Sequence, residues 1–255
     1  MKGLKNIFNT KAKGLLSLIV AFVLIGFVDS RQSALPCKGF TIFLEGLEEN
    51  QFLDENEVKS LLEDHGEDEL TGKDLSMIDL RKLEQRALAH PYINKCDIYK
   101  DLEGMLIVNA LLRKPMARIV RSNGPDAYIA FDGVILPISD KFTSRVVLVS
   151  GNFSDKLLSD DFSSSAYGVQ FLEFLSYIYL DNFWKAQIAQ LDIDKNGEIT
   201  LYPQVTKQII EFGEPDHFEE KLRKLKVFYK EALPLKGWNN YVRINLKYEN
   251  QIIAE

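Results

Sequence analysis

The sequence has few of the residues that build metal centres or disulfide frameworks. Its 255 residues include two cysteines and three histidines, which are scattered along the chain. A structural zinc site needs four ligands at short, regular spacings, and no such spacing occurs here. The sequence therefore predicts no metal site from Cys37, Cys96, His65, His90 and His217.

Signatures of catalysis are missing as well. The chain contains no G-x-S-x-G nucleophile turn, no phosphate-binding P-loop, no H-E-x-x-H zinc motif and no G-x-G-x-x-G dinucleotide fingerprint. Its 37 acidic residues are dispersed, and the short acidic clusters at 55–57 and 67–69 are typical of a solvated surface. We expect neither a catalytic residue nor a cofactor, and the protein is predicted not to be an enzyme.

Negative charge exceeds positive charge in the body of the chain. Lys2, Lys5, Lys11 and Lys13 give the first thirteen residues a charge of +4, which leaves −10 for the remainder of a chain whose net charge is −6. An acidic body repels the phosphate backbone of nucleic acids. No nucleic-acid partner is therefore expected.

Long hydrophobic runs are absent with one exception, at residues 14–28. These fifteen positions carry no charge and would form about 22 Å of helix, against a hydrocarbon core of about 30 Å, so the run spans a lipid bilayer if Lys13 extends to the interface. A cleaved signal peptide is the alternative, which the small residues at 32–34 keep open. Lysines before the run and Asp29 after it predict a cytoplasmic N-terminus and a body outside the cytoplasm, which in a bacterium is the periplasm.

A periplasmic location affects the interpretation of the cysteines, because oxidising compartments permit disulfides. Cys37 precedes a predicted first strand and Cys96 lies in a later strand, so a bridge between neighbouring strands is one interpretation. Two buried free thiols are the other. The sequence leaves both open.

The first part of the body predicts the order strand, helix, helix, strand, strand. The first helix begins at a capping box of Asp54 and Glu57 and ends at Gly66. The second begins around Asp79 and is stopped by Pro91. The strands are predicted at 40–44, 93–100 and 105–113, with a turn at 101–104 between the last two.

The second part predicts a β-rich domain with two amphipathic helices, so the fold class is α+β. Ion pairs of Glu219 with Arg223 and of Glu220 with Lys224 are expected on the solvated face of the second helix. The helices are predicted at 168–182 and 215–229. The strands are predicted at 117–121, at 128–136 around a turn at Asp132-Gly133, and at 146–149, 186–193, 198–202 and 205–212.

Residues 192–199 match the first eight positions of an EF-hand calcium loop. The match fails at position twelve, which requires a bidentate glutamate and is occupied by Pro203. The flanking residues alternate as strands do, and Asn196-Gly197 between two strands is typical of a hairpin turn. We therefore predict a turn here and no calcium site.

A short motif follows the last strand of the first part. Arg113, Pro115 and Ala117 match an Arg-x-Pro-x-Ala signature, and residues 131–134 with Pro137 match the hairpin that comes after it. These two motifs resemble the end of the POTRA region in FtsQ/DivIB cell-division proteins and the hairpin that follows it. The POTRA module is a small three-stranded sheet with two helices on one face, in the β-α-α-β-β order predicted above.

The C-terminal part adds to the resemblance. Gly237 and Trp238 form a Gly-Trp turn after a helix, and the next predicted strand ends in the pair Lys247-Tyr248. Over essentially the whole chain, the sequence resembles the FtsQ/DivIB family, in the versions of Bacteroidetes-type bacteria. The tail at 249–254 departs from the small, glycine-bearing tail of proteobacterial members.

The tail itself is predicted to be an alternating terminal strand with an open edge. An open edge offers unpaired N–H and C=O groups to which a partner peptide can add a strand. The resemblance implies that the partner is FtsB in complex with FtsL. A strand that merely closes the domain is the other interpretation. The candidate partner-binding residues are Tyr248, Asn250, Gln251, Ile252 and Ile253.

The resemblance implies a single-pass protein of the inner membrane at the division septum, where it positions FtsB and FtsL near the septal peptidoglycan synthases and other divisome membrane proteins. Alternatives are a secreted or membrane-anchored periplasmic enzyme and a POTRA-type translocation component. The second would need a long barrel of alternating strands. The predicted parts are a cytoplasmic tail at 1–13, a transmembrane helix at 14–28, a POTRA domain at 37–114 and a C-terminal β domain at 115–255.

Overall fold

The computed structural model describes residues 15, 17–20, 35–46, 51–159, 161–238 and 240–255. The chain divides into two compact units. Of the described residues, the N-terminal unit contains those up to Glu45 together with Leu53–Leu111, and the C-terminal unit contains those within 46–52 and 112–255. Each unit contains helices and strands, so the α+β class is confirmed.

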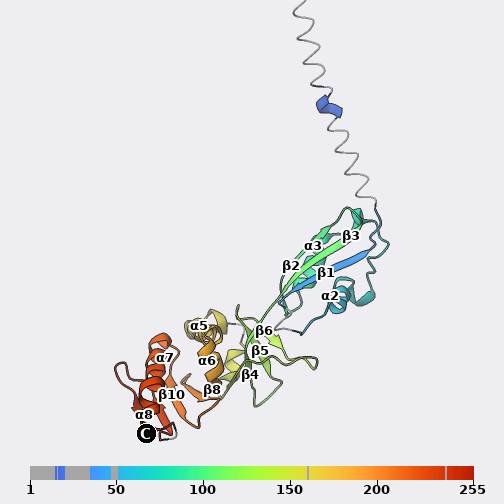
Figure 1. Ribbon diagram of the computed structural model, residues 1–255. Helices are drawn as coiled ribbons and strands as arrows, with labels where there is room; N and C mark the ends of the chain where they lie inside the picture. Colours follow the sequence, from blue (N-terminus) through green and yellow to red (C-terminus); the bar gives the residue numbers. More distant parts are fainter. Residues whose placement is uncertain (1–14, 16, 21–34, 47–50, 160, 239) are drawn as a thin grey trace, which may run out of the picture. The chain divides into compact units, whose positions relative to one another are not determined.

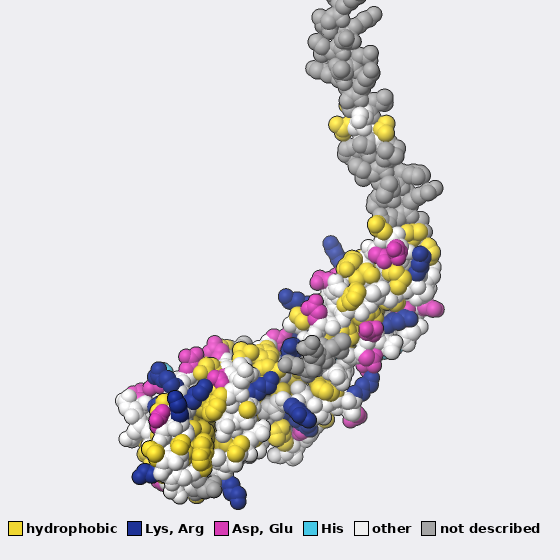
Figure 2. Space-filling model, in the orientation of Figure 1, with side chains coloured by type: hydrophobic (Ala, Val, Ile, Leu, Met, Phe, Trp, Pro, Cys, Tyr) yellow, Lys and Arg dark blue, Asp and Glu magenta, His cyan; other side chains and the backbone are white. Residues whose placement is uncertain are grey.

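The predicted cytoplasmic tail at 1–13 lies outside the described residues, and so does most of the predicted transmembrane segment at 14–28. Leu15 and residues 17–20 are helical, and their apolar side chains are exposed (Figure 2). Within the described ranges, no helix has the length and hydropathy needed to cross a bilayer. The anchor stays a prediction.

The N-terminal unit has the predicted β-α-α-β-β order (Figure 1). Its elements are β1 (Gly39–Glu45), α2 (Glu55–Leu62), the short 3-10 turns η2 (Asp64–Gly66) and η3 (Leu75–Met77), α3 (Leu80–Leu88), β2 (Ile93–Lys100) and β3 (Met105–Leu112). The strand order in the sheet is β1-β3-β2, with β1 parallel to β3.

The helices of this unit begin where their caps predict. The Asp54 carboxylate accepts from the backbone N–H of Glu57, while the Glu57 carboxylate accepts from the N–H of Asp54, at 2.9 and 3.0 Å. Asp79 caps α3. Helix α2 ends at Leu62 and not at the predicted Gly66, because the next residues form the separate turn η2 with positive backbone φ.

One face of the three-stranded sheet is buried. Leu106, Val108 and Ala110 of β3 are fully buried, whereas the residues between them are partly exposed. Val58 of α2 and Leu83 of α3 are buried as well, and these helices contact each other and the strands β1 and β2. This alternation places the core of the unit on one side of the sheet.

Cys37 and Cys96 are free thiols, and both are buried. Cys37 precedes β1 and Cys96 lies in β2, and β3 stands between these two strands in the sheet. The expectation of a bridge between neighbouring strands is therefore corrected, because β1 and β2 are not neighbours. Burial raises the pKa of both thiols, that of Cys96 to about 11.

The C-terminal unit is built on one sheet with helices packed against it (Figure 1). The strands are β4 (Pro115–Ile119), β5 (Ala127–Ala130), β6 (Ile135–Pro137), β7 (Val147–Ser150), β8 (Ile188–Ile193), β9 (Ile199–Pro203), β10 (Ile209–Gly213), β11 (Arg243–Asn245) and β12 (Ile253–Ala254). The helices are α4 (Ser154–Leu157), the 3-10 turn η4 (Phe162–Ser164), α5 (Ala166–Leu180), α6 (Asn182–Gln187), α7 (Phe218–Val227), the π-helix η5 (Phe228–Ala232) and α8 (Leu233–Lys236).

The nine strands follow the order β12-β11-β10-β9-β8-β7-β4-β5-β6. Strand β7 is parallel to both β4 and β8, and β10 is parallel to β11; the remaining pairs are antiparallel. The sheet therefore has two edges, β6 and β12. Strand β6 is three residues long and ends at Pro137, which limits its use as a pairing edge.

The predicted apolar stripe of α5 forms much of the core. Phe171, Leu175 and Ile178 are at most 1% exposed, and the Phe174 ring stacks on Phe212 of β10 with centroids 4.6 Å apart. These contacts place the apolar face of the helix predicted at 168–182 in the core. Helix α7 contributes buried leucines to the same cluster.

Two predicted strands of this unit are shorter than expected. The strand predicted at 186–193 begins only at Ile188, because the Asp181 carboxylate accepts from the N–H groups of Phe183 and Trp184 and starts the helix α6. The strand predicted at 205–212 begins at Ile209. In the first case a cap residue overrides the alternating pattern.

Strands β8 and β9 form the predicted hairpin. Asp194 accepts from the N–H groups of Asn196 and Glu198 at 2.8 and 2.9 Å, and Gly197 has φ +89°. In these bonds the Asp194 carboxylate accepts from the backbone of its own hairpin, and they define a turn. No group of three or more candidate metal ligands occurs among the residues that the structure describes.

Candidate functional site

The candidate site is the β12 edge of the nine-stranded sheet. Strand β12 pairs antiparallel with β11, with Ala254 opposite Ile244 and Ile253 opposite Asn245. On its other side, no strand pairs with β12 among the described residues. The predicted open edge is therefore present.

Strand β11, which pairs with the edge strand β12, is fixed to the sheet through Glu211 of β10. One oxygen of its carboxylate accepts from the Arg243 guanidinium at 2.5 Å, and the other accepts from the Asn245 amide at 2.7 Å. Both donors lie on β11, which is parallel to β10 and in register with it. A single carboxylate thus ties β11, the strand that pairs with β12, to β10.

The tail between β11 and β12 turns before it becomes extended. The ammonium group of Lys224 on α7 donates to the backbone carbonyls of Tyr248 and Glu249, both at 2.7 Å. The backbone N–H of Lys247 donates to the Asn245 side chain at 3.0 Å. These local and long-range bonds bend the chain where an alternating strand was expected.

The five predicted partner-binding residues are therefore divided between a turn and an edge. Tyr248 and Asn250 are exposed in the turn, which corrects their expected place on a strand. Ile253 lies on β12 with its side chain 37% exposed. Ile252 packs against the hydrophobic core, and Gln251 is exposed just before it.

The sequence did not identify Lys224 as part of this site. Its predicted ion pair with Glu220 is absent, as is the pair of Glu219 with Arg223, since neither occurs among the described ion pairs. Instead, the Lys224 ammonium group donates to the backbone carbonyls of Tyr248 and Glu249. An i, i+4 pattern on a helix could not reveal this, because the acceptors lie 24 and 25 residues further along the chain.

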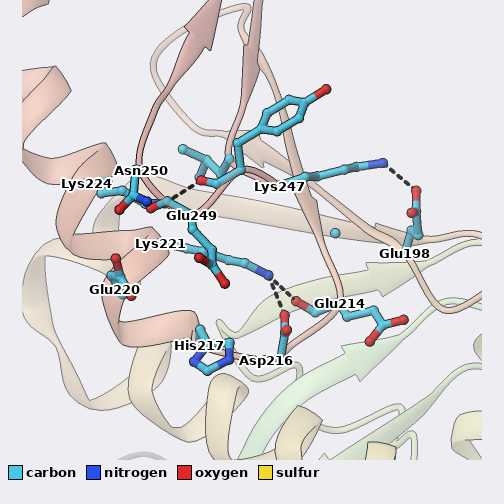
Figure 3. A pocket seen from close by; sticks show the side chains of 13 residues that line it. Glu198, Glu214, Asp216, His217, Glu220, Lys221, Lys224, Lys247, Glu249 and Asn250 are labelled. Carbon is cyan, nitrogen blue, oxygen red and sulfur yellow. Dashed lines mark hydrogen bonds and ion pairs between the residues drawn. The ribbon is translucent and has the colours of Figure 1, made fainter.

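A polar pocket of about 550 Å³ lies beside the tail (Figure 3). Lys221 lies at the buried floor of the pocket and is only 9% exposed. Its ammonium group donates to the backbone carbonyl of Glu214 and to the carboxylate of Asp216. Lys247 pairs with Glu198 at 2.5 Å at the other end. The lysines of the pocket thus bond to the tail and to the residues that precede α7, which indicates a structural role.

A second, mainly apolar groove of about 440 Å³ runs along the other side of the tail. Val227 and Phe228 form one wall, and Ile252 with the neighbouring Gln251 forms the other. The groove follows the π-helix η5, a kind of irregularity that often marks functional positions. An apolar surface therefore connects Ile252, the residue before β12, with the helix.

The motif at the start of the C-terminal unit joins two of its strands. The Arg113 guanidinium donates to the Asp132 carboxylate at 2.7 Å, and Asp132 lies in the turn between β5 and β6. Pro115 and Ala117 are buried in β4. The two matched sequence segments are thus in direct contact.

The Gly-Trp turn supports the same end of the sheet. Gly237 has φ +96°, a conformation that favours glycine, and ends α8. The backbone carbonyl of Trp238 accepts from the Gln208 side chain at 3.0 Å. The centroid of the Trp238 ring lies 6.1 Å from that of the Tyr229 ring. Burial raises the pKa of the Tyr229 hydroxyl to about 12.

A family model of a POTRA-like domain matches residues 35–110, and a model described as FtsQ/DivIB, C-terminal related, matches residues 114–255, which is more than half of the chain. A search of curated proteins finds no match. Both models describe families of non-enzymatic scaffold domains.

The chain belongs to the FtsQ/DivIB family, as the motifs predicted. Membership indicates a role in bacterial cell division. The POTRA-like assignment agrees with the β-α-α-β-β order of the N-terminal unit, and the second match covers the β-rich unit that carries the β12 edge.

Proposed function

We propose that this protein is a scaffold of the bacterial divisome that binds FtsB, in complex with FtsL, through its β12 edge. It carries out no catalysis itself. By holding these partners, it positions them near the septal peptidoglycan synthases. The observation that carries the proposal is the open side of β12 in a protein of this family.

The same proposal includes a single-pass topology. The uncharged run at 14–28 would anchor the protein in the inner membrane at the division septum, with the lysine-rich residues 1–13 in the cytoplasm and both units in the periplasm. The charge asymmetry of the sequence supports this orientation. A partner that is itself anchored in the membrane would then meet the β12 edge on the periplasmic side.

A partner strand would use the backbone groups that the hydrogen-bond pattern of β12 directs outward. Arg243 and Glu255 exchange two backbone hydrogen bonds, of 2.9 and 3.0 Å. In an antiparallel ladder the next residue, Ala254, then directs its N–H and C=O groups away from β11. These groups are the ones that an added strand would pair with.

The direct test is the variant Ala254→Pro. Proline removes the outward N–H and adds a ring on the open side, while the inward bonds of Ile253 and Glu255 to β11 remain. We expect binding of the FtsB and FtsL periplasmic segments to weaken about tenfold or more. The matched control Ala254→Val keeps the N–H and should bind as the natural protein does.

A second form of the test removes the tail altogether by ending the chain at Lys247. Loss of binding in this form and in Ala254→Pro would support strand addition. Unchanged binding by both would place the interface elsewhere on the scaffold. Thermal unfolding of each variant verifies that the sheet is intact before binding is compared.

A further inference from the structure

A cavity of about 500 Å³ opens in the C-terminal unit, away from the β12 edge in the strand order. Strands β4, β7 and β8 contribute to its lining, together with the last turn of α5 and with α6. Its volume lies within the range of about 300–1,000 Å³ that is usual for small-molecule sites. The proposed partner interface does not use it.

The inner wall of this cavity is apolar. Met116, Ile178 and Ile188 are each at most 2% exposed, and Val147 and the Tyr179 ring are partly exposed toward the opening. No carboxylate occurs among the described residues that line it. The polar pocket of Figure 3, by contrast, is lined by several acidic side chains.

Two cations stand at the opening. Lys185 on α6 places its ammonium group 3.9 Å from the centroid of the Tyr179 ring. Arg145 precedes β7, is exposed, and makes no hydrogen bond or ion pair with any residue that the structure describes. In a chain of net charge −6, these side chains give an apolar cavity a charge of +2.

We propose that this cavity binds a small amphiphilic anion, with an apolar chain in the cavity and an anionic head group between Arg145 and Lys185. Burial of the chain against Met116, Ile178 and Ile188 supplies affinity through the hydrophobic effect. The head group forms charge-assisted hydrogen bonds with two cations that pair with no carboxylate of the described residues. A neutral molecule with the same chain gains only the first contribution.

The test uses the full chain in lipid nanodiscs and a dodecanoate that carries a photoreactive diazirine in its chain. After irradiation, mass spectrometry of peptides locates the label. We expect labelling within 145–148 and 178–189. The alcohol with the same chain and diazirine should label these segments about fivefold less, because it lacks the charge.

Two variants make the result specific. Arg145→Gln with Lys185→Gln removes the charge from exposed positions and should reduce labelling about fivefold, and Ala189→Leu should reduce it by filling the cavity. Equal labelling by the alcohol, equal labelling of either variant, or label confined to other segments would each overturn the proposal. Circular dichroism confirms that both variants fold.

Discussion

The ammonium group of Lys224 lies 2.7 Å from the backbone carbonyl oxygen of Tyr248 and bridges to the next carbonyl, that of Glu249. A helix is thereby connected to the turn that precedes the edge strand. Because strand addition depends on a fixed edge, Lys224 acts as a positioning residue for the proposed interface. It is expected to contact no partner itself.

The variant Lys224→Met should loosen the tail. It removes two hydrogen bonds from a charged donor at an exposed site, which together contribute about 1 kcal/mol. Hydrogen exchange of the backbone at 249–255 should become faster, and FtsB and FtsL should bind about fivefold more weakly. Lys230→Met, an exposed lysine on η5, is the control. Unchanged exchange in Lys224→Met would exclude the positioning role.

The ion pair of Arg113 with Asp132 should stabilise the C-terminal unit. The Arg113 side chain is only 16% exposed, so the pair is screened less than a surface pair. A double-mutant cycle with Arg113→Gln and Asp132→Asn should give a coupling free energy of about 1 kcal/mol in urea unfolding. A coupling of zero would mean that the motif is retained for another reason.

Gly168 should tolerate no side chain. A Cβ atom at this position would lie 1.7 Å from the carbonyl oxygen of Phe162. Alanine favours helices over glycine by about 1 kcal/mol, yet the clash should dominate and lower the free energy of unfolding by about 2–3 kcal/mol. The control Gln170→Ala, exposed on the same helix, should change stability little. A stable Gly168→Ala variant would contradict the packing of η4 against α5.

The two thiols should react slowly in the folded protein. Burial raises the pKa of Cys37 and raises that of Cys96 to about 11, so little thiolate is present at neutral pH. Iodoacetamide should label both residues rapidly only after denaturation, and mass spectrometry of peptides reports each site. Rapid labelling of native Cys96, compared with a denatured sample, would contradict its burial.

His90 should make the N-terminal unit less stable in mild acid. Burial lowers its pKa below 6.5, and the Tyr92 N–H donates to its Nδ1 atom, which must be unprotonated to accept. The unfolded chain therefore binds the proton more readily, so stability is full above about pH 6.5 and falls as pH decreases through the folded pKa. Thermal unfolding from pH 7.5 to 5 should show this loss.

The variant His90→Gln should lose that dependence on pH. His65→Gln, at an exposed position of the same unit, should keep it. If His90→Gln and the natural protein depend on pH equally in this range, another group is responsible. Asp68, whose pKa is lowered by Lys73 and Arg86, acts only at more acidic pH.

Much of the local structure followed from the sequence alone. The capping box of Asp54 and Glu57, the cap at Asp79 and the turn at Asn196-Gly197 are fixed by bonds between residues a few positions apart. Helix α5 followed from the spacing of its apolar residues. Such features need no knowledge of distant parts of the chain, and the family resemblance rested on short motifs of the same kind.

What only the tertiary structure decided are the relations between distant segments. The placement of β3 between β1 and β2, and so the separation of Cys37 from Cys96, depends on strand order, which no local pattern encodes. The bend at Tyr248 depends on Lys224, and the +2 cavity depends on bringing Arg145 and Lys185 together. In each case the deciding free energy comes from groups far apart in sequence, which meet only once the sheet has formed.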